Sequence, residues 1–409
     1  MSRTLNVYLC GRKAGVLSED DLRQLSFRYD SGNYRELSVA LPVRAEEYTH
    51  AFAYPFFENL TPEGEAFDLL TKDHAAGNKT FTLLDRFGGD CAGAVAFYET
   101  GPGLNLGKKL YEITPAKMTQ IIDRLPQDPL LTGIRNPPRL SLAGAQMKFA
   151  VYVQSGRYYR SDDENPTTHI IKIPNSRFPF ILENELFCMK LAQMLELDIP
   201  KTEIKTVNAG GNKRTYLEIE RYDRHIEKGS MNRIHQEDFC QALGITSDRK
   251  YQAGGGASIK DCFRIIEKFS VNQLIDITRF TKWIIYNYLI GNTDAHAKNL
   301  ALLHTESGIR LAPFYDLLSI EIYPEKLVDH SMAMLINGKG KYASLRPKDF
   351  TALFGTLGLN ATNMMKSLGA EFAGVVSNAE NLRDSLPDIP IYDQIISIIK
   401  RRWTLFATG

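Results

Sequence analysis

The stretch that decides the fold is Thr293-Asp294-Ala295-His296-Ala297-Lys298-Asn299, together with Ala312-Pro313-Phe314-Tyr315-Asp316 further along the chain. In the first segment an Asp precedes an Asn by five positions, and the second places another Asp in an apolar turn. Kinases use this order for phosphoryl transfer, because the first Asp accepts a hydroxyl proton while the Asn and the later Asp hold Mg²⁺ on the nucleotide phosphates. The pattern therefore predicts a kinase that uses ATP and Mg²⁺, with Asp294 as catalytic base and with Asn299 and Asp316 as metal ligands.

A non-catalytic alternative exists for Asp294, because an Asp in a loop commonly caps the next helix. That alternative does not explain Asp316, since a carboxylate in apolar sequence is costly to bury unless it binds a cation or a donor. Lys298 either neutralises the transferring phosphoryl group or is a solvated loop lysine. His296 is placed in the ATP site as a structural donor, with no role in proton transfer.

A small-residue loop, Ser141-Leu142-Ala143-Gly144-Ala145-Gln146, precedes a predicted strand. Small residues let backbone N–H groups approach a phosphate, so Ala143, Gly144, Ala145 and Gln146 are candidates for ATP binding. An ordinary turn between strands is the alternative. Ser141 is either a turn-stabilising donor or a phosphate acceptor, and a phosphate there would repel those of ATP.

Two further segments are candidates for nucleotide binding. Lys172 ends a β-branched strand, where kinases place the lysine that binds the α- and β-phosphates, and Glu185 in the next helix is its expected partner. The alternative is a solvated lysine on an edge strand. Glu220 and Tyr222 lie in Glu220-Arg221-Tyr222-Asp223-Arg224, which is expected to be a hinge whose backbone binds adenine. The alternative is a charged inter-domain linker whose Arg and Asp side chains pair with each other.

Patterning along the chain predicts three parts. Residues 1–103 begin with alternating apolar positions bounded by turn residues, as in hairpins, and also contain helical segments near residues 56–60 and 67–70. Residues 104–223 are strand-rich, with a predicted hairpin at 149–159, and residues 224–409 are mainly helical. This order predicts an α+β, two-lobed kinase-like fold with a β-rich N-terminal part and an all-α C-terminal lobe.

Composition excludes several classes of function. The formal net charge of +1 over 409 residues gives no global attraction to nucleic acid or membrane. The five cysteines have no C-x-x-C spacing, which argues against a zinc site and a disulfide framework. No signal-peptide pattern or apolar run of membrane-spanning length is present, so a cytoplasmic protein without membrane contact is expected.

The ordered motifs resemble those of the HipA family, the serine/threonine kinase toxins of bacterial toxin–antitoxin pairs, which are distantly similar to phosphoinositide kinases. The resemblance is carried by Ser141–Gln146, Thr168–Lys172, Asp294–Asn299 and Pro313–Asp316, and in the N-terminal part by Phe57-Glu58-Asn59-Leu60 and Gly89–Val95. It implies a HipB-like helix-turn-helix antitoxin, contact with operator DNA through that complex, and autophosphorylation of Ser141. It also implies phosphorylation of an aminoacyl-tRNA synthetase of the glutamate–tRNA ligase type, which blocks translation and produces growth arrest and persistence.

One residue departs from the family pattern, because Met147 stands where an acidic residue is expected after Gln146. Two other functions remain open at this point. One is a kinase of a small molecule or lipid, since the same Asp/Asn/Asp set serves those acceptors. The other is a non-catalytic, kinase-like body that helps an antitoxin bind DNA, although such a body has no need for a metal-binding pair.

Overall fold

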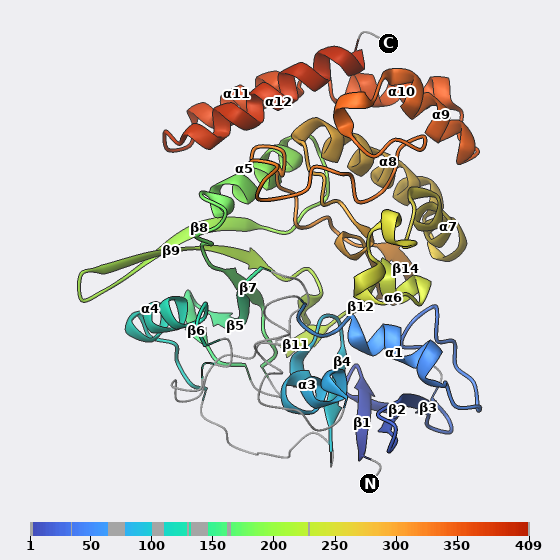
Figure 1. Ribbon diagram of the computed structural model, residues 1–409. Helices are drawn as coiled ribbons and strands as arrows, with labels where there is room; N and C mark the ends of the chain where they lie inside the picture. The colour runs from blue at the N-terminus through green and yellow to red at the C-terminus, as the bar shows by residue number, and fades with distance from the viewer. Residues whose placement is uncertain are drawn as a thin grey trace. The chain divides into compact units, whose positions relative to one another are not determined.

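The computed structural model describes residues 3–33, 35–63, 78–99, 110–128, 131, 146–161, 165–227 and 230–407. They form two compact units, each assembled from separate pieces of the chain (Figure 1). The first unit comprises Met1–Ile173, Glu203–Ser247 and Leu302–Glu306, and the second comprises Pro174–Thr202, Asp248–Ala301 and Ser307–Gly409. Strands dominate the first unit and helices the second, which confirms the predicted α+β fold class. The three-part division at residues 103 and 223 stays a prediction.

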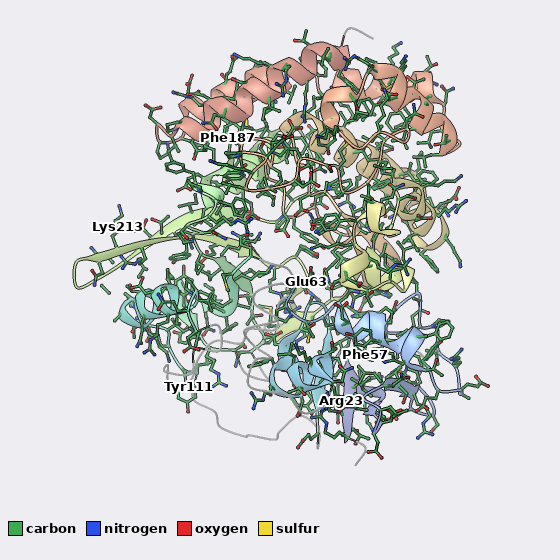
Figure 2. All side chains as sticks on the ribbon, viewed as in Figure 1. Arg23, Phe57, Glu63, Tyr111, Phe187 and Lys213 are labelled. Carbon is green, nitrogen blue, oxygen red and sulfur yellow. The ribbon has the colours of Figure 1, made fainter. Side chains whose placement is uncertain are left out.

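An antiparallel sheet with strand order β3-β2-β1-β4 forms the N-terminal part of the first unit. Leu5, Val7 and Leu9 alternate along β1 and are at most 5% exposed, as their spacing predicts. Helix α1 adds aromatic residues to the same core, among them Phe57, which is labelled in Figure 2. The helix expected near residues 67–70 lies outside the described residues. The elements are β1 (Arg3–Leu9), β2 (Arg12–Glu19), β3 (Leu25–Tyr29), α1 (His50–Glu58), α3 (Lys79–Phe87), η1 (Gly88–Asp90) and β4 (Val95–Tyr98).

The second sheet of the first unit has strand order β6-β5-β7-β9-β8, so β7 is its central strand. β5 and β6 form the predicted hairpin, and its turn uses Ser155 and Gly156 at positive φ angles of 50° and 74°. The elements are α4 (Pro115–Arg124), β5 (Lys148–Gln154), β6 (Arg157–Tyr159), β7 (His169–Lys172), β8 (Thr202–Ala209) and β9 (Asn212–Glu220).

Short strands also occur after residue 224, in the part predicted as all-α. β10 (Arg224–Glu227) pairs with β11 (Ser230–Arg233). β12 (His235–Asp238) pairs with β13 (Ala301–Thr305), although three α-helices separate these two strands in the chain. Buried and less buried residues alternate along β12, which is strand periodicity. Four-residue strands are too short for such alternation to be recognised in the sequence. The helical C-terminal part therefore also contains strands.

Helices form most of the second unit, and α7 (Ile259–Phe269) and α8 (Gln273–Ile290) occur where apolar periodicity predicts them. α5 (Ile181–Met194) packs against α11 (Val375–Asp384) and α12 (Pro390–Ala407), and the Phe187 ring (labelled in Figure 2) stacks on Tyr392 at 5.0 Å between centroids. Arg402 of α12 donates to the carbonyl of Tyr288 in α8 and pairs with Glu321. Among the described residues, no helix combines the length and apolar character that crossing a membrane requires.

The remaining elements are α5 (Ile181–Met194), α6 (Phe239–Leu243), η2 (Ser247–Arg249), η3 (Gln252–Gly254), α7 (Ile259–Phe269), α8 (Gln273–Ile290), η4 (Ala297–Asn299), β14 (Gly308–Leu311), η5 (Tyr342–Ser344), α9 (Pro347–Thr356), α10 (Ala361–Glu371), α11 (Val375–Asp384) and α12 (Pro390–Ala407).

Candidate active site

The predicted catalytic loop begins directly after α8, in the second unit. Gly291 caps α8 in the left-handed conformation, with φ at 76°, and so turns the chain out of the helix. The backbone carbonyl of Asp294 then accepts hydrogen bonds from the His296 N–H at 2.9 Å and from Asn299 Nδ2 at 3.0 Å. These two bonds fold the loop so that Asp294 and Asn299 lie together, as the motif spacing predicts.

The side chain of Asp294 is half-buried, and its Oδ1 accepts a 2.7 Å hydrogen bond from the Tyr251 hydroxyl. The Tyr251 ring also packs edge-on against the ring of His296, with centroids 5.5 Å apart. The helix that follows, η4, begins after His296 and has no side-chain cap, so the interpretation of Asp294 as a helix cap is wrong. Tyr251 was not predicted as a site residue, because nothing in the sequence connects it with a loop 43 positions later.

Asn292, which is 1% exposed, connects the catalytic loop with the predicted metal-binding turn. Its Oδ1 accepts from the Asp294 N–H at 3.2 Å, and its Nδ2 donates to the carbonyl of Asp316 at 3.4 Å. The Tyr315 hydroxyl adds a second link by donating to the carbonyl of Lys298 at 2.6 Å. A buried amide that uses both donor and acceptor fixes the segments it joins. The two motifs predicted from the sequence are therefore held together by Asn292, a residue that no sequence motif marks.

The remaining residues of these motifs differ in burial. Asp316 has a φ of 53°, in the left-handed region that Asp tolerates better than most residues, and such backbone strain is concentrated at functional sites. Its side chain is half-buried. Lys298 and His296 are each 6% exposed, so the interpretation of Lys298 as a solvated loop lysine is wrong. The buried position of His296 suits a structural role.

The donor set of Asn299 and Asp316 fits a hard cation such as Mg²⁺. Asn299 Nδ2 donates to the Asp294 carbonyl, so its amide oxygen is the atom that it can offer to a cation, and Asp316 adds a carboxylate. In the described part of the chain, no group of three or more His, Cys, Asp or Glu side chains could hold a metal by itself. Mg²⁺ usually binds one or two protein ligands and completes its shell with substrate phosphates and water. The pair therefore suits a cation that arrives with a nucleotide.

Apart from His296 and Lys298, the candidates for nucleotide binding that the structure describes lie in the first unit. Lys172 ends the central strand β7 and is 4% exposed, so the interpretation as an edge lysine is wrong. Glu220 ends β9 with an exposed side chain, and Tyr222 is partly exposed. The N–H of Arg221 donates to the Thr168 carbonyl at 2.9 Å, so this amide is not available to adenine. Any adenine contact from the hinge must come from its other backbone groups.

The expected phosphate-binding loop is described only at its end. Ser141, Ala143, Gly144 and Ala145 lie outside the described residues, whereas Gln146 forms a bend just before β5. Glu185, the expected partner of Lys172, lies in α5 of the second unit and is fully buried. The structure thus brings the predicted catalytic and metal-binding residues together in the second unit, with His296 and Lys298, and it describes Gln146, Lys172, Glu220 and Tyr222 in the first.

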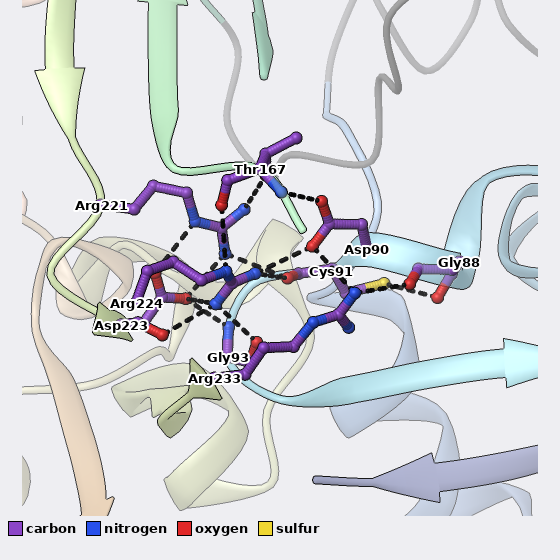
Figure 3. Close-up of polar contacts among 10 residues, drawn as sticks. Gly88, Asp90, Cys91, Gly93, Thr167, Arg221, Asp223, Arg224 and Arg233 are labelled. Carbon is purple, nitrogen blue, oxygen red and sulfur yellow. Dashed lines mark hydrogen bonds and ion pairs between the residues drawn. The ribbon is translucent and has the colours of Figure 1, made fainter. Parts of the chain in front are cut away.

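A buried cluster of charged residues includes the Arg and Asp side chains of the predicted hinge (Figure 3). Arg224 pairs with Asp90 at 2.9 Å and with Asp223 at 3.0 Å, while Arg221 pairs with Asp223 at 2.7 Å. Arg233 approaches Asp90 at 3.3 Å. The expectation that the hinge Arg and Asp residues pair with each other is confirmed. The hinge Arg and Asp side chains are buried and also contact Asp90 and Gly93 of the N-terminal part, and such buried charges need these partners.

The arginines keep both carboxylates of the cluster ionised. Burial raises the pKa of Asp90, but the nearby charges of Arg233, Arg224 and Arg221 outweigh it and hold this pKa well below the usual value. Burial also opposes ionisation of Asp223, yet Arg221 and Arg224 lower its pKa to about 2. The cluster therefore retains its charges at neutral pH.

The backbone of Gly93 connects the N-terminal part of the first unit with this cluster. Its N–H donates to Asp223 Oδ2 at 2.7 Å, and its carbonyl accepts from Arg224 Nη1 at 2.9 Å. Gly93 has a φ of 72°, and a Cβ there would lie 2.6 Å from the backbone nitrogen of Gln236, so the position requires glycine. The Gly89–Val95 segment thus positions the predicted hinge.

Comparisons with known proteins identify relatives of this chain. A family model of the HipA N-terminal domain matches residues 5–98, and one of the HipA-like C-terminal domain matches residues 140–379, a range that contains every candidate site residue. The putative kinase Y4mE of Sinorhizobium fredii is 38% identical over 362 residues, which cover 85% of this chain and 83% of that protein. The serine/threonine-protein kinase toxin HipA of Shewanella oneidensis is 30% identical over 388 residues, which cover 89% and 86%. A solved structure of the Shewanella oneidensis HipA, HipB and operator DNA complex contains a chain that matches with a TM-score of 0.81 and 26% identity, over 99% of this chain and 96% of that one.

Proposed function

This chain belongs to the HipA family of serine/threonine kinase toxins, and from that premise we propose that it transfers the γ-phosphoryl group of ATP to a hydroxyl of a target protein. The observation that supports this most directly is the Asn292 side chain, which joins the Asp294 loop to the Asp316 turn. A body that only helped another protein to bind DNA would gain nothing from holding these two loops in a fixed relation. The arrangement is the one that phosphoryl transfer requires.

The residues of the second unit divide the chemistry between them. The substrate oxygen attacks the γ-phosphorus, the bond from that phosphorus to the β-bridging oxygen breaks, ADP leaves, and the hydroxyl proton passes to the Asp294 carboxylate. Asn299 and Asp316 hold Mg²⁺, which neutralises charge on the nucleotide phosphates when bound. Lys298 lies in the same loop and stabilises the transferring group, while Tyr251 orients the carboxylate of Asp294.

We assign the remaining nucleotide contacts to residues 143–146, Lys172, Glu220 and Tyr222 of the first unit. Lys172 binds the α- and β-phosphates, and the hinge backbone at Glu220 and Tyr222 binds adenine. The backbone N–H groups of the small-residue loop at 143–146 enclose the phosphates. The buried charge cluster of Figure 3 holds the hinge segment in place through Arg221, Asp223 and Arg224.

We further propose that the kinase modifies its own Ser141 and thereby silences itself, because a phosphate with a charge of about −1.5 to −2 beside this loop would repel ATP. After incubation with Mg²⁺-ATP, intact-mass spectrometry with peptide mapping is expected to show one phosphate, on Ser141. Ser141→Ala should carry none and should slow cell growth more than the parent, because it cannot be silenced. Ser377→Ala, at an exposed serine of α11, is the control and should behave as the parent. Equal toxicity of Ser141→Ala and the parent would rule out self-silencing.

The proposed target is an aminoacyl-tRNA synthetase of the glutamate–tRNA ligase type, whose modification would block translation and arrest growth. This proposal rests on the family alone. The proteins that gain phosphate when the parent is expressed, but not when Asp294→Asn is expressed, are the substrates. If only metabolites gained phosphate in that comparison, the protein-kinase proposal would be wrong and the acceptor would be a small molecule or lipid.

The partner that we propose is a HipB-like antitoxin, with operator DNA bound through that complex. The matching Shewanella oneidensis structure contains HipA, HipB and operator DNA. The formal net charge of +1 gives this chain no general affinity for DNA. In a gel-shift assay we therefore expect the chain alone to leave operator DNA unshifted and the antitoxin to produce a shift that the chain strengthens. Sequence-specific binding by the chain alone would contradict this division of roles.

A further inference from the structure

We propose that Arg279 is a positioning residue for the metal-binding turn: it holds the backbone of residues 311–314 and so sets the place of Asp316. The inference deepens the proposed kinase function and rests on the metal role assigned there to Asp316. Arg279 lies in α8, in the same unit as the turn, and no sequence motif marks it.

The guanidinium of Arg279 binds two consecutive backbone carbonyls that precede the turn. Nη1 donates to the Leu311 carbonyl at 2.7 Å, and Nη2 donates to the Ala312 carbonyl at 2.9 Å. The same two nitrogens bind carboxylates, Nη1 to Asp276 at 3.0 Å and Nη2 to Asp198 at 2.9 Å. The side chain is 15% exposed. Its planar group is thus fixed by two charged partners while it holds the chain that leads to Asp316.

The two carboxylate residues hold neighbouring atoms of the same segment. Asp276, which is fully buried, accepts at Oδ2 from the Leu311 N–H at 2.8 Å. The backbone carbonyl of Asp198 accepts from the Phe314 N–H at 2.8 Å. The segment from 311 to 314 is therefore bound at four backbone atoms by Arg279, Asp276 and Asp198, which we call the Arg279 anchor.

The position of the Arg279 anchor explains why it bears on metal binding. Phe314 lies only two residues before Asp316, and the Asp316 carbonyl is held by Asn292. The turn is thus fixed on its N-terminal side by the anchor and at Asp316 itself by the catalytic loop. At the second of these points Asp316 adopts its left-handed backbone, a strained conformation that its surroundings hold in place. Without the anchor, we expect the carboxylate to lose its fixed direction while the fold of the unit remains.

Lysine cannot replace this arginine, because an ammonium group has no planar fork to reach carbonyls and carboxylates together. Arg279→Lys keeps the charge and should still weaken metal use. A surface pocket of about 230 Å³, lined by Arg279, Ile275, Leu197, Phe314 and others, lies beside the side chain. Free guanidinium can therefore reach the space that Arg279→Ala would open.

The experiment compares Arg279→Lys and Arg279→Ala with the parent in the full chain. The Mg²⁺ concentration that gives half-maximal phosphoryl transfer is expected to rise by at least about tenfold in both, since small misplacements of a site group have such effects. ATP binding without Mg²⁺ should not change. Millimolar guanidinium, but not methylammonium, should lower the Mg²⁺ requirement of Arg279→Ala. Lys282→Ala is the matched control, because Lys282 lines the same pocket and pairs with Glu371 rather than with the turn. It should keep the parental Mg²⁺ requirement.

Asp316→Ala separates the two proposals. If Asp316→Ala leaves the Mg²⁺ requirement unchanged, the metal assignment fails and the inference fails with it. If Asp316→Ala raises the requirement but both Arg279 variants keep the parental value, only the inference is overturned. A parallel loss of ATP binding with and without Mg²⁺ in Arg279→Lys would show a merely structural role and would also overturn it. Should Arg279→Ala not fold, Arg279→Lys decides the matter.

Discussion

Asn in place of Asp294 is expected to slow phosphoryl transfer by about 10²- to 10⁴-fold and to leave the affinity for Mg²⁺-ATP unchanged. The amide has almost the shape of the carboxylate, and its oxygen can still accept the hydrogen bond that Tyr251 donates to Asp294 at 2.7 Å. The bonds that fold the loop end on the backbone carbonyl of residue 294, which the substitution keeps. The variant therefore loses its proton acceptor while the loop is preserved. Single-turnover transfer from labelled ATP gives the rate, and calorimetry gives the affinity.

The matched control is Asp248→Asn, which makes the same chemical change at an exposed carboxylate of η2, a few residues before Tyr251. It should transfer phosphate at the parental rate. If Asp294→Asn kept a rate within about threefold of the parent, another group would be accepting the proton, because removing a general base costs far more than this. If it lost ATP binding as well, Asp294 would belong to the nucleotide site instead.

The second large effect is expected on stability, where Asp90→Asn should lower the free energy of unfolding by about 3–5 kcal/mol. The Asp90 side chain is 1% exposed and pairs with Arg224 at 2.9 Å. It also accepts from the Thr167 N–H at 2.8 Å. The substitution removes the Asp90 carboxylate but leaves the Arg224 guanidinium buried. Removing one partner of a buried ion pair is strongly destabilising, because the other charge stays buried without that partner. Urea denaturation followed by circular dichroism measures the change.

An exposed ion pair in the same unit supplies the control. Lys13 and Asp30 are 3.4 Å apart, with side chains 39% and 37% exposed, so Asp30→Asn should cost less than about 1 kcal/mol. Equal costs for Asp90→Asn and Asp30→Asn would mean that the buried cluster contributes no more than a surface pair.

The same cluster gives the parent a characteristic dependence on acid. The pKa values of Asp90 and Asp223 are lowered by folding, that of Asp223 to about 2. Their contribution to stability is therefore complete above the ordinary Asp pKa of about 4, and it is lost as the pH falls from there toward about 2. Asp90→Asn should lose less stability over this range than the parent does. Parallel curves would indicate that Asp90 titrates normally in the folded protein.

The placement of the candidate site residues could be predicted from the sequence where it depends on local spacing. Asp294 and Asn299 share one loop, so their relation follows from the motif itself, and α7 and α8 follow from helical periodicity over many residues. The strands β5 to β7 were likewise predictable from alternating or β-branched runs. In each case the information lies within a short stretch of chain.

The parts that could not be predicted depend on contacts between distant segments. Tyr251 reaches Asp294 across 43 positions, and Arg279 reaches Leu311 across 32. Arg224 of the hinge meets Asp90 across 134 positions. Such residues have no local pattern, because their role is set by where the fold brings them. The buried amide of Asn292 is similar, since its link to Asp316 spans 24 positions.

The packing of α5 against α11 and α12 bears on when this enzyme can first act during its synthesis. The Phe187 ring meets Tyr392 only after some two hundred further residues have been translated, and Arg402 then braces the end of α8 from which the catalytic loop departs. Contacts of such long sequence separation form late, because the loop entropy must be overcome first. A nascent chain in which Asp294 and Asp316 have already left the ribosome therefore still lacks the contacts that α12 makes with α5 and α8. We therefore expect phosphoryl transfer to begin only after α12 has been translated and has packed against α8.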